Sequence, residues 1–198
     1  MLVLASASPR RQDLLRNAGI AFIVQPADID ETPRAGELPL AYSARMAREK
    51  ALAVSKVRPE DHVLGADTIV VVDEAILGKP RDADDAMRML RLLSGRTHQV
   101  ITAVCLVSPV ASSQWAVASE SRGNLRTDSE ITVVSMSPWS DEEIHAYIAT
   151  GEPMDKAGAY AIQGGAASWI PRIEGDYSNV VGLPLELVRR MLRECGAV

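Results

Sequence analysis

Apolar positions along the chain follow two patterns, short continuous runs and longer stretches with helical spacing. Residues 2–5 form an apolar run that predicts a buried strand. Ser8 and Pro9 then match a helix N-cap followed by a first-turn proline, and Gly19 ends the predicted helix. A strand that leads directly into a helix begins an alternation that continues along the chain and favours an α/β fold.

The remaining elements follow from the same signals. Apolar or alternating runs predict strands at residues 21–24, 63–72, 76–77, 97–107, 131–136 and 169–173. Capping residues and helical spacing predict helices at residues 38–57, from Asp82 to Gly95, from Ser140 to Gly151 and from Pro184 onward. Turn residues predict a hairpin at Asp73 and Glu74 and loops at residues 25–36 and 155–165.

Residues 108–121 are poorly patterned and are expected to form a hairpin tip or a mobile loop. No internal repeat, low-complexity segment or clear linker is evident in the sequence. We therefore expect residues 1–198 to form a single domain with lobes rather than independent domains.

The composition narrows the class of protein. Of the 198 residues, 47% are hydrophobic and 24% are charged, as in an ordinary globular protein. The net charge of −5 argues against broad nucleic-acid binding, so an anionic ligand must meet a local basic cluster. Cys105 and Cys195 lack metal-type spacing and predict reduced thiols in a cytoplasmic protein. Neither a basic leader nor an apolar run of membrane-spanning length is present, so we expect no signal peptide and no membrane span.

The junction between the first strand and the first helix is a candidate phosphate site. Ser8, Arg10 and Arg11 lie where free backbone amides and the helix dipole favour an anion. Arginine adds a planar fork of donors. The alternative is an ordinary capped helix with solvated arginines, and this segment alone does not decide between them.

Two acidic residues are candidates for catalysis and cation binding. Asp67 lies inside a strand-like apolar run, where a carboxylate is costly unless it is paired or binds metal. Glu31 lies in an acidic loop, and together with Asp67 it could provide oxygen ligands for Mg²⁺. The alternatives are an Asp67 paired with a structural arginine or backbone amide, and a Glu31 that belongs to a simple turn.

Two lysines could neutralise phosphates. Lys50 lies on the helix predicted at residues 38–57, within a stripe of alanines, and Lys79 is held between a glycine and a proline. Helical lysines are more often solvated, so Lys79 is the more unusual of the two. The sequence contains no Walker-type motif, which excludes a P-loop protein. His98 is interpreted as a structural residue that orients a loop through hydrogen bonds.

The glycine-rich segment 155–165 is the second candidate for ligand binding. Its glycines would allow a close approach of backbone to ligand. Gln163 offers an amide that can read a base edge through one donor and one acceptor. The alternative is a glycine-rich connection that carries a surface glutamine.

These features occur together as short motifs in one order over nearly the whole chain. They are the turn at residues 6–11, Glu31, Lys50, the segment 65–68, Lys79 with Pro80, and the segments 95–98 and 155–160. Their joint occurrence resembles the Maf family of nucleoside triphosphate pyrophosphatases, whose members were once named septum-formation inhibitors. The resemblance implies an elongated mixed sheet with flanking helices and two lobes around a cleft, related to the inosine triphosphatase (Ham1) fold.

The resemblance also implies an activity. It implies hydrolysis of dTTP, UTP and modified pyrimidine triphosphates to the monophosphate and pyrophosphate, with Mg²⁺ or Mn²⁺ as cofactor. Asp67 corresponds to the catalytic residue and binds the metal together with Glu31. Arg10, Thr68 and Gln163 correspond to the specificity positions of the dTTP/UTP branch. The triphosphate would be held by Ser8, Arg11, Lys50 and Lys79.

The resemblance leaves two rival functions open. One rival is the same reaction on 7-methyl-GTP, which belongs to a branch whose sequence differs at residues 155–165. The other is a nucleotide-binding regulator of cell division whose hydrolysis is incidental. A homodimer is in keeping with the family, and the segment 108–126 is longer than the family leads us to expect.

Overall fold

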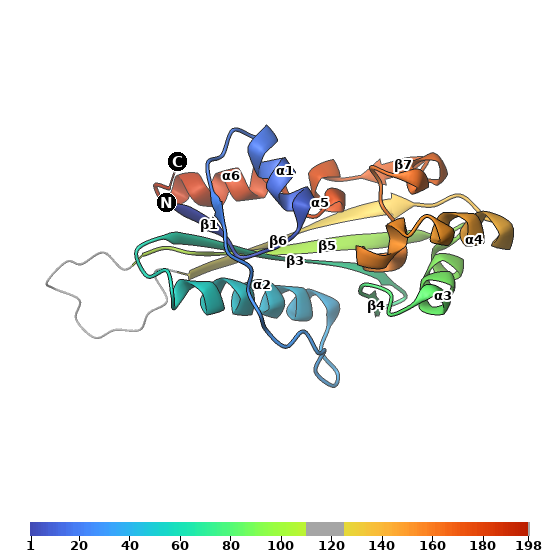
Figure 1. The fold of residues 1–198 in the computed structure, drawn as a ribbon, viewed down its shortest axis with the longest axis horizontal. Coiled ribbons are helices and arrows are strands. Elements are labelled where there is room, and N and C mark those ends of the chain that lie inside the picture. Colours follow the sequence, from blue (N-terminus) through green and yellow to red (C-terminus); the bar gives the residue numbers. More distant parts are fainter. Residues whose placement is uncertain (110–124, 198) are drawn as a thin grey trace, which may run out of the picture. The chain divides into compact units, whose positions relative to one another are not determined.

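The structure is a computed structural model that describes residues 1–109 and 125–197. Most of the segment 108–126 therefore lies outside the described residues. Within them the chain forms a seven-stranded mixed sheet with flanking helices, in agreement with the predicted α/β class. The strand order is β2-β1-β3-β5-β6-β7, and β4 pairs with β3 (Figure 1).

The elements follow one another in a fixed order along the chain. The strands are β1 (Leu2–Leu4), β2 (Ile23–Val24), β3 (His62–Val72), β4 (Ala75–Leu77), β5 (Thr97–Val107), β6 (Leu125–Ser135) and β7 (Arg172–Glu174). The helices are α1 (Pro9–Asn17), α2 (Pro39–Ser55), α3 (Ala83–Leu93), α4 (Asp141–Ala149), α5 (Tyr177–Val181) and α6 (Leu185–Glu194). Short 3₁₀ turns occupy Glu152–Asp155, Ala157–Ala159 and Gly165–Trp169.

The described residues separate into two compact units. Unit 1 comprises residues 1–67, 103–109, 125–129 and 183–197, and unit 2 comprises residues 68–102 and 130–182. In unit 1, β1 runs parallel to both β2 and β3. In unit 2, β3 pairs antiparallel with β4, and β6 pairs antiparallel with β7.

Both faces of the unit 1 sheet are buried, which explains why its strands read as unbroken apolar runs. Leu4 and Leu64 pack on the face covered by α1 and α6, whereas their neighbours Val3 and Val63 pack on the face covered by α2. This alternation follows from the two-residue period of a strand. Figure 1 shows α2 on one side of the sheet and α1 with α6 on the other.

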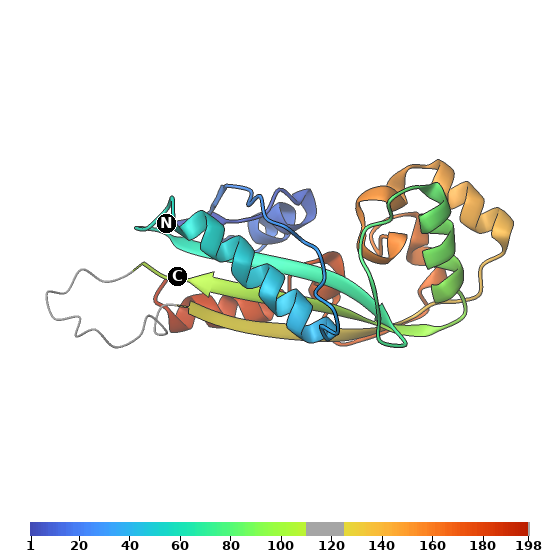
Figure 2. The same ribbon diagram turned by 90° about the horizontal axis from the view of Figure 1, so that it is seen from below.

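Helix α2 lies unusually close to β3, because the strand carries a glycine at the crossing point. A Cβ atom on Gly65 would lie 2.2 Å from the carbonyl oxygen of Ala47 and 2.8 Å from the amide nitrogen of Ala51. The small alanines of α2 therefore allow its backbone to approach the strand. Figure 2 shows α2 lying across the sheet. Because of this close packing, side chains of α2 can contact side chains of β3.

Unit 2 has its own hydrophobic core, built between its part of the sheet and helices α3 and α4. Trp139 and Trp169 stack with their ring centroids 4.0 Å apart. Asp73 and Glu74 both have positive φ angles, 48° and 65°, which form the predicted hairpin turn between β3 and β4. His98 is buried and lies 2.7 Å from the Tyr160 hydroxyl through Nε2, which confirms the structural interpretation of this histidine.

Two strand predictions were wrong in detail, and one helix was missed. Strand β6 begins at residue 125, not 131, because its first six residues are mostly polar and give no apolar signal. The predicted strand 169–173 is instead the end of a 3₁₀ turn followed by β7, and the short helix α5 was not predicted. By contrast, the strand predicted at residues 63–72 is confirmed as β3, which runs unbroken through Gly65 and Asp67 although these residues interrupt its apolar pattern.

Two further observations concern the sequence expectations. Cys105 is buried, Cys195 is partly buried, and both are free thiols. Among the helices of the described residues, none is both long and apolar enough to cross a membrane.

Candidate active site

The centre of the candidate site is an ion pair between a strand and a helix of unit 1. Asp67 lies on β3 and is 6% exposed, and its Oδ1 atom accepts a hydrogen bond of 2.7 Å from Nζ of Lys50 on α2. Lys50 can reach Asp67 because Gly65 lets α2 pack directly on β3. The sequence alternative of a helical lysine on a solvated face is therefore wrong for Lys50.

The same ammonium group also contacts the acidic loop. Nζ of Lys50 lies 3.0 Å from Oε1 of Glu31, whose side chain is 57% exposed. The carboxylates of Glu31 and Asp67, which are far apart in the sequence, thus share the ammonium group of Lys50. The structure brings Glu31 and Asp67 together, as the sequence analysis expected, and places Lys50 between them.

Arg11 provides a second cation near Asp67. It lies in the first turn of α1, it is 9% exposed, and its Nη1 atom donates to Ser6 Oγ at 3.1 Å and to the Ala66 carbonyl at 2.9 Å. The Ser8 hydroxyl accepts from the Arg11 amide at 3.5 Å and forms the predicted N-cap. Arg11 is therefore directed towards the β3 backbone beside Asp67 rather than into solvent.

The electrostatics of this group depend on burial and on charge. Burial raises the pKa of the Asp67 carboxyl, and the cations of Lys50 and Arg11 counteract that rise while Glu31 adds to it. Burial lowers the pKa of Arg11, and the charge of Asp67 opposes that fall. A carboxylate with a raised pKa is a better proton acceptor than a solvated aspartate.

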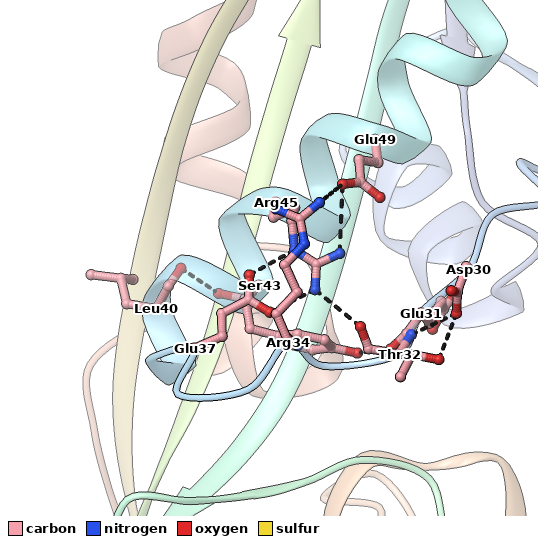
Figure 3. Close-up of polar contacts among 10 residues, drawn as sticks. Asp30, Glu31, Thr32, Arg34, Glu37, Leu40, Ser43, Arg45 and Glu49 are labelled. Carbon is pink, nitrogen blue, oxygen red and sulfur yellow. Dashed lines mark hydrogen bonds and ion pairs between the residues drawn. The ribbon is translucent and has the colours of Figure 1, made fainter.

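Two residues of α2 that the sequence analysis did not identify contact the loop that carries Glu31. The Tyr42 hydroxyl donates to the Glu31 carbonyl at 2.8 Å, and burial together with the charges of Asp67 and Glu31 raises the pKa of Tyr42 to about 12. Arg45 binds Glu37 and the Thr32 carbonyl (Figure 3). In the sequence Arg45 forms only an i,i+4 pair with a glutamate, which indicates an ordinary helix surface.

The remaining predicted site residues lie in the first turn of α1 and in unit 2. Arg10 is half-buried in the first turn of α1. In unit 2, Thr68 is half-buried, and its Oγ1 atom lies 2.9 Å from Thr102 Oγ1 and 3.3 Å from the Gly182 carbonyl. Lys79 and Gln163 are exposed on loops of the same unit.

The glycine-rich segment has a local structural role that its sequence did not reveal. A Cβ atom on Gly164 would lie 1.6 Å from Oε1 of Glu152. The other carboxylate oxygen of Glu152 accepts a hydrogen bond of 2.9 Å from the amide of Gly165. These glycines therefore allow the backbone to wrap around a glutamate, next to the exposed Gln163.

The carboxylates of Glu31 and Asp67 form a donor set that fits a hard divalent cation. Both are oxygen ligands, and both already converge on one positive group. Among residues 1–109 and 125–197, no cluster of three or more His, Cys, Asp or Glu side chains could hold a metal ion. Mg²⁺ commonly takes one or two carboxylates from the protein and further oxygens from substrate phosphates, so two are sufficient.

Comparison with known proteins indicates the same protein family as the sequence motifs. The family model described as "Maf-like protein" matches residues 1–195, and the chain belongs to the Maf family. This confirms the resemblance drawn from the sequence. A protein of Koribacter versatilis named "dTTP/UTP pyrophosphatase" is 52% identical over 197 residues, which are 100% of this chain and 95% of that protein.

Other relatives carry the same name. The proteins of Geobacter metallireducens and Geobacter sulfurreducens, both named "dTTP/UTP pyrophosphatase", are 50% and 51% identical over 100% of this chain and 97% of their own length. Among solved structures, the Staphylococcus aureus Ham1 protein is similar over 98% of each chain, with 12% identity and a TM-score of 0.47.

Proposed function

We propose that this chain hydrolyses nucleoside triphosphates, with dTTP and UTP as substrates, to the nucleoside monophosphate and pyrophosphate. The names of relatives that are 50–52% identical over the whole chain support this activity. The structural observation that carries the proposal is the buried group of Arg11, Lys50 and Asp67 with the Glu31 carboxylate beside it. It combines cations for phosphates with a carboxylate that can accept a proton.

The phosphate-binding role falls to residues at the start of α1 and on α2. Ser8, Arg10 and Arg11 belong to the first turn of α1, where the helix dipole favours an anion. Lys50 neutralises carboxylates in the unliganded protein, and a bound triphosphate would give its ammonium additional oxygen partners. Lys79 is exposed and would add a further positive charge.

We further propose that the activity depends on Mg²⁺ or Mn²⁺, held by Glu31 and Asp67. Such a cation neutralises phosphate charge and polarises the phosphorus centre when it is bound. The residues that would hold it are those whose carboxylates already share one cationic partner.

The chemical step follows from the position and burial of Asp67. A water oxygen attacks the α-phosphorus, the bond to the oxygen that bridges the α- and β-phosphates breaks, and pyrophosphate leaves with that oxygen. Asp67 orients the water and accepts its proton as the new bond to phosphorus forms. Arg11 and Lys50 stabilise the negative charge that moves onto the leaving group.

Base selection is assigned to Gln163, Thr68 and Arg10. The amide of Gln163 can pair with one donor and one acceptor of uracil or thymine, but after a half-turn it could equally pair with cytosine. A second polar group must therefore reject CTP, and Thr68 or Arg10 is the candidate. Modified pyrimidine triphosphates that keep the same base edge would also be accepted.

The test of the proposal is a nucleotide panel with product analysis. UTP and dTTP should give UMP and dTMP plus pyrophosphate only when Mg²⁺ or Mn²⁺ is present. Diphosphate with orthophosphate as products would contradict cleavage at the α-phosphorus. Preference for 7-methyl-GTP would favour the other branch of the family, and binding without turnover would favour a nucleotide-binding regulator.

The specificity assignment has its own test. Gln163→Ala should lower kcat/KM for UTP and dTTP more than for other triphosphates, because a polar mismatch at a base edge costs roughly 1–3 kcal/mol. Equal losses for UTP, CTP and GTP would show that Gln163 does not read the base. A cytoplasmic location fits the two free thiols, and a homodimer stays a prediction.

A further inference from the structure

The loop that carries Glu31 needs an explanation for its position. Residues 25–38 lie outside helices and strands, and the side chain of Glu31 is 57% exposed. A carboxylate on such a loop would lose much of its value as a ligand if the loop could move, because a ligand set must be held in place before the cation arrives. Its anchors therefore bear directly on cation binding.

Two successive backbone carbonyls, at Glu31 and at the residue after it, are held by α2. The carbonyl of Glu31 accepts a hydrogen bond of 2.8 Å from the Tyr42 hydroxyl. The carbonyl of the next residue, Thr32, accepts a hydrogen bond of 3.2 Å from Nη2 of Arg45. Asp30 stiffens the turn from within, because its Oδ1 accepts from the amide and the hydroxyl of Thr32 at 2.9 and 2.6 Å.

Arg45 also binds the far end of the loop. Its Nε and Nη2 atoms donate to the two carboxylate oxygens of Glu37, each at 2.6 Å, and Nη1 lies 3.5 Å from Glu49 (Figure 3). The side chains of Arg45 and Glu37 are only 13% and 10% exposed, and the hydrogen bond from Arg45 lowers the pKa of Glu37 to about 2. The guanidinium lies 5.5 Å from the centre of the Tyr42 ring, so the two anchors support each other.

We propose that Arg45, together with Tyr42, is a positioning residue that fixes the Glu31 carboxylate opposite Asp67 for cation binding. The inference rests on the proposed function in one respect, the assignment of Glu31 as a cation ligand. Helix α2 provides both the anchors and Lys50, and Tyr42 and Lys50 are eight residues apart and lie on the same face. One rigid helix therefore sets the distance between the loop carboxylate and the strand carboxylate.

A lysine could not replace Arg45 in this role. The planar fork of Arg45 contacts Glu37, Glu49 and the Thr32 carbonyl at the same time, whereas a lysine is a point charge with one nitrogen. Arg34 is a matched control, since it lies in the same loop, contacts the same Glu49 at 3.5 Å and is 69% exposed. Its side chain does not hold Glu31 in the contacts that the structure describes.

The experiment is a double-mutant cycle on Mn²⁺ affinity. Mn²⁺ binding is measured by electron paramagnetic resonance in complexes with a UTP analogue whose α–β bridge cannot be hydrolysed. Loss of an outer partner of a metal ligand typically weakens binding about 10- to 100-fold, which is the loss expected for Arg45→Gln. Arg34→Gln should change the Mn²⁺ affinity less than about twofold, as for an exposed ion pair. Arg45→Lys should weaken Mn²⁺ binding less than Arg45→Gln does, but its affinity should stay below that of the wild type.

The decisive arm uses the Glu31→Gln background. If Arg45 acts through Glu31, Arg45→Gln should weaken Mn²⁺ binding no further once the Glu31 carboxylate is gone. The same fold-loss in both backgrounds would overturn the inference. Mn²⁺ binding unchanged by Glu31→Gln alone would instead overturn the proposed cation site, so the two failures are distinguishable.

A second variant guards against a general loss of structure. Tyr42→Phe removes only the hydroxyl that donates to the Glu31 carbonyl and keeps the buried ring. It should weaken Mn²⁺ binding less than Arg45→Gln does, with a nearly unchanged melting temperature, and this loss should also vanish in the Glu31→Gln background. Lower stability with unchanged Mn²⁺ affinity would show that the anchors are merely structural.

Discussion

Lys50 donates a 2.7 Å hydrogen bond from Nζ to Oδ1 of Asp67 at a site where both side chains are about 90% buried. The same ammonium lies 3.0 Å from Glu31, so it stands between the two carboxylates that we assign to a divalent cation. A cation that binds these oxygens must compete with an ammonium already in place. Nucleotide phosphates would relieve this competition by giving Lys50 other partners, which links cation binding to nucleotide binding.

This relationship predicts opposite effects of one substitution. In Lys50→Gln the competing charge is lost, so Mn²⁺ should bind the nucleotide-free protein more tightly than it binds the wild type, whereas kcat/KM for UTP should fall. The first effect is measured as the rise in melting temperature on addition of Mn²⁺, because a ligand that binds only the folded state stabilises it. A smaller Mn²⁺-induced rise in the variant than in the wild type would contradict the competition.

Gly65 makes this ion pair geometrically possible, and its substitution should disturb both stability and activity. In Gly65→Ala the new Cβ would lie 2.2 Å from the Ala47 carbonyl, so α2 must move away from β3 and carry Lys50 with it. We expect a loss of about 1–3 kcal/mol in the free energy of unfolding, as for an overpacked core, together with a lower kcat. Denaturant unfolding and steady-state kinetics measure the two effects.

The control for this prediction is Gly78→Ala, compared for stability alone. A Cβ atom on Gly78 would meet no atom within 4 Å. Its free energy of unfolding should change by no more than about 0.5 kcal/mol, as for an ordinary surface substitution. Equal losses in the two variants would mean that the close contact between α2 and β3 is not what makes Gly65 necessary.

His98 predicts a specific dependence of stability on pH. Burial lowers the pKa of His98 from 6.5 to about 4, so the unfolded chain binds a proton that the folded chain does not between these two values. The free energy of unfolding is therefore unaffected by the titration of His98 above pH 6.5, and it decreases as the pH falls from 6.5 towards 4. The difference of 6.5 − 4 = 2.5 corresponds to roughly 3 kcal/mol.

The measurement compares wild type with His98→Gln, which retains a polar group near the Tyr160 hydroxyl. Free energies of unfolding are determined from pH 4 to 7.5, and the difference between the two proteins isolates the histidine from the carboxylates that titrate nearby. That difference should shrink as the pH falls through this window. A difference independent of pH would show that His98 titrates normally in the folded protein.

Local signals made several elements predictable from the sequence. The Ser8 N-cap with Pro9, the Asp82 cap that accepts from the Asp85 amide at 2.8 Å, and the capping box at Ser140 all form as their sequences indicate. Each depends on residues three positions apart, so the sequence alone contains the information. The apolar runs of the central strands were equally clear, because both sheet faces of unit 1 are buried.

The parts that could not be predicted depend on contacts between distant segments. Arg45 looks like a solvated helix residue until the loop folds back and places Glu37 and the Thr32 carbonyl against it. Trp169 looked like the start of a strand, but stacking on Trp139 holds it in a 3₁₀ turn. The pairing of Lys50 with both Glu31 and Asp67 depends on the packing of α2 on β3, which no local pattern specifies.

The last prediction separates an enzyme from a nucleotide-binding protein. In Asp67→Asn the side chain keeps its shape but can no longer accept a proton, and it is a weaker ligand for a cation. Turnover of UTP should fall about 10²- to 10⁴-fold, the usual loss when a catalytic acid–base group is removed, and the lost cation ligand would add to this. Arg11 and Lys50 remain, so UTP should still bind, as measured by calorimetry beside steady-state hydrolysis. A melting curve checks the fold, since Lys50 loses its buried partner. A folded Asp67→Asn variant with near-normal kcat would move the chemistry elsewhere and leave Asp67 as a structural partner of Lys50.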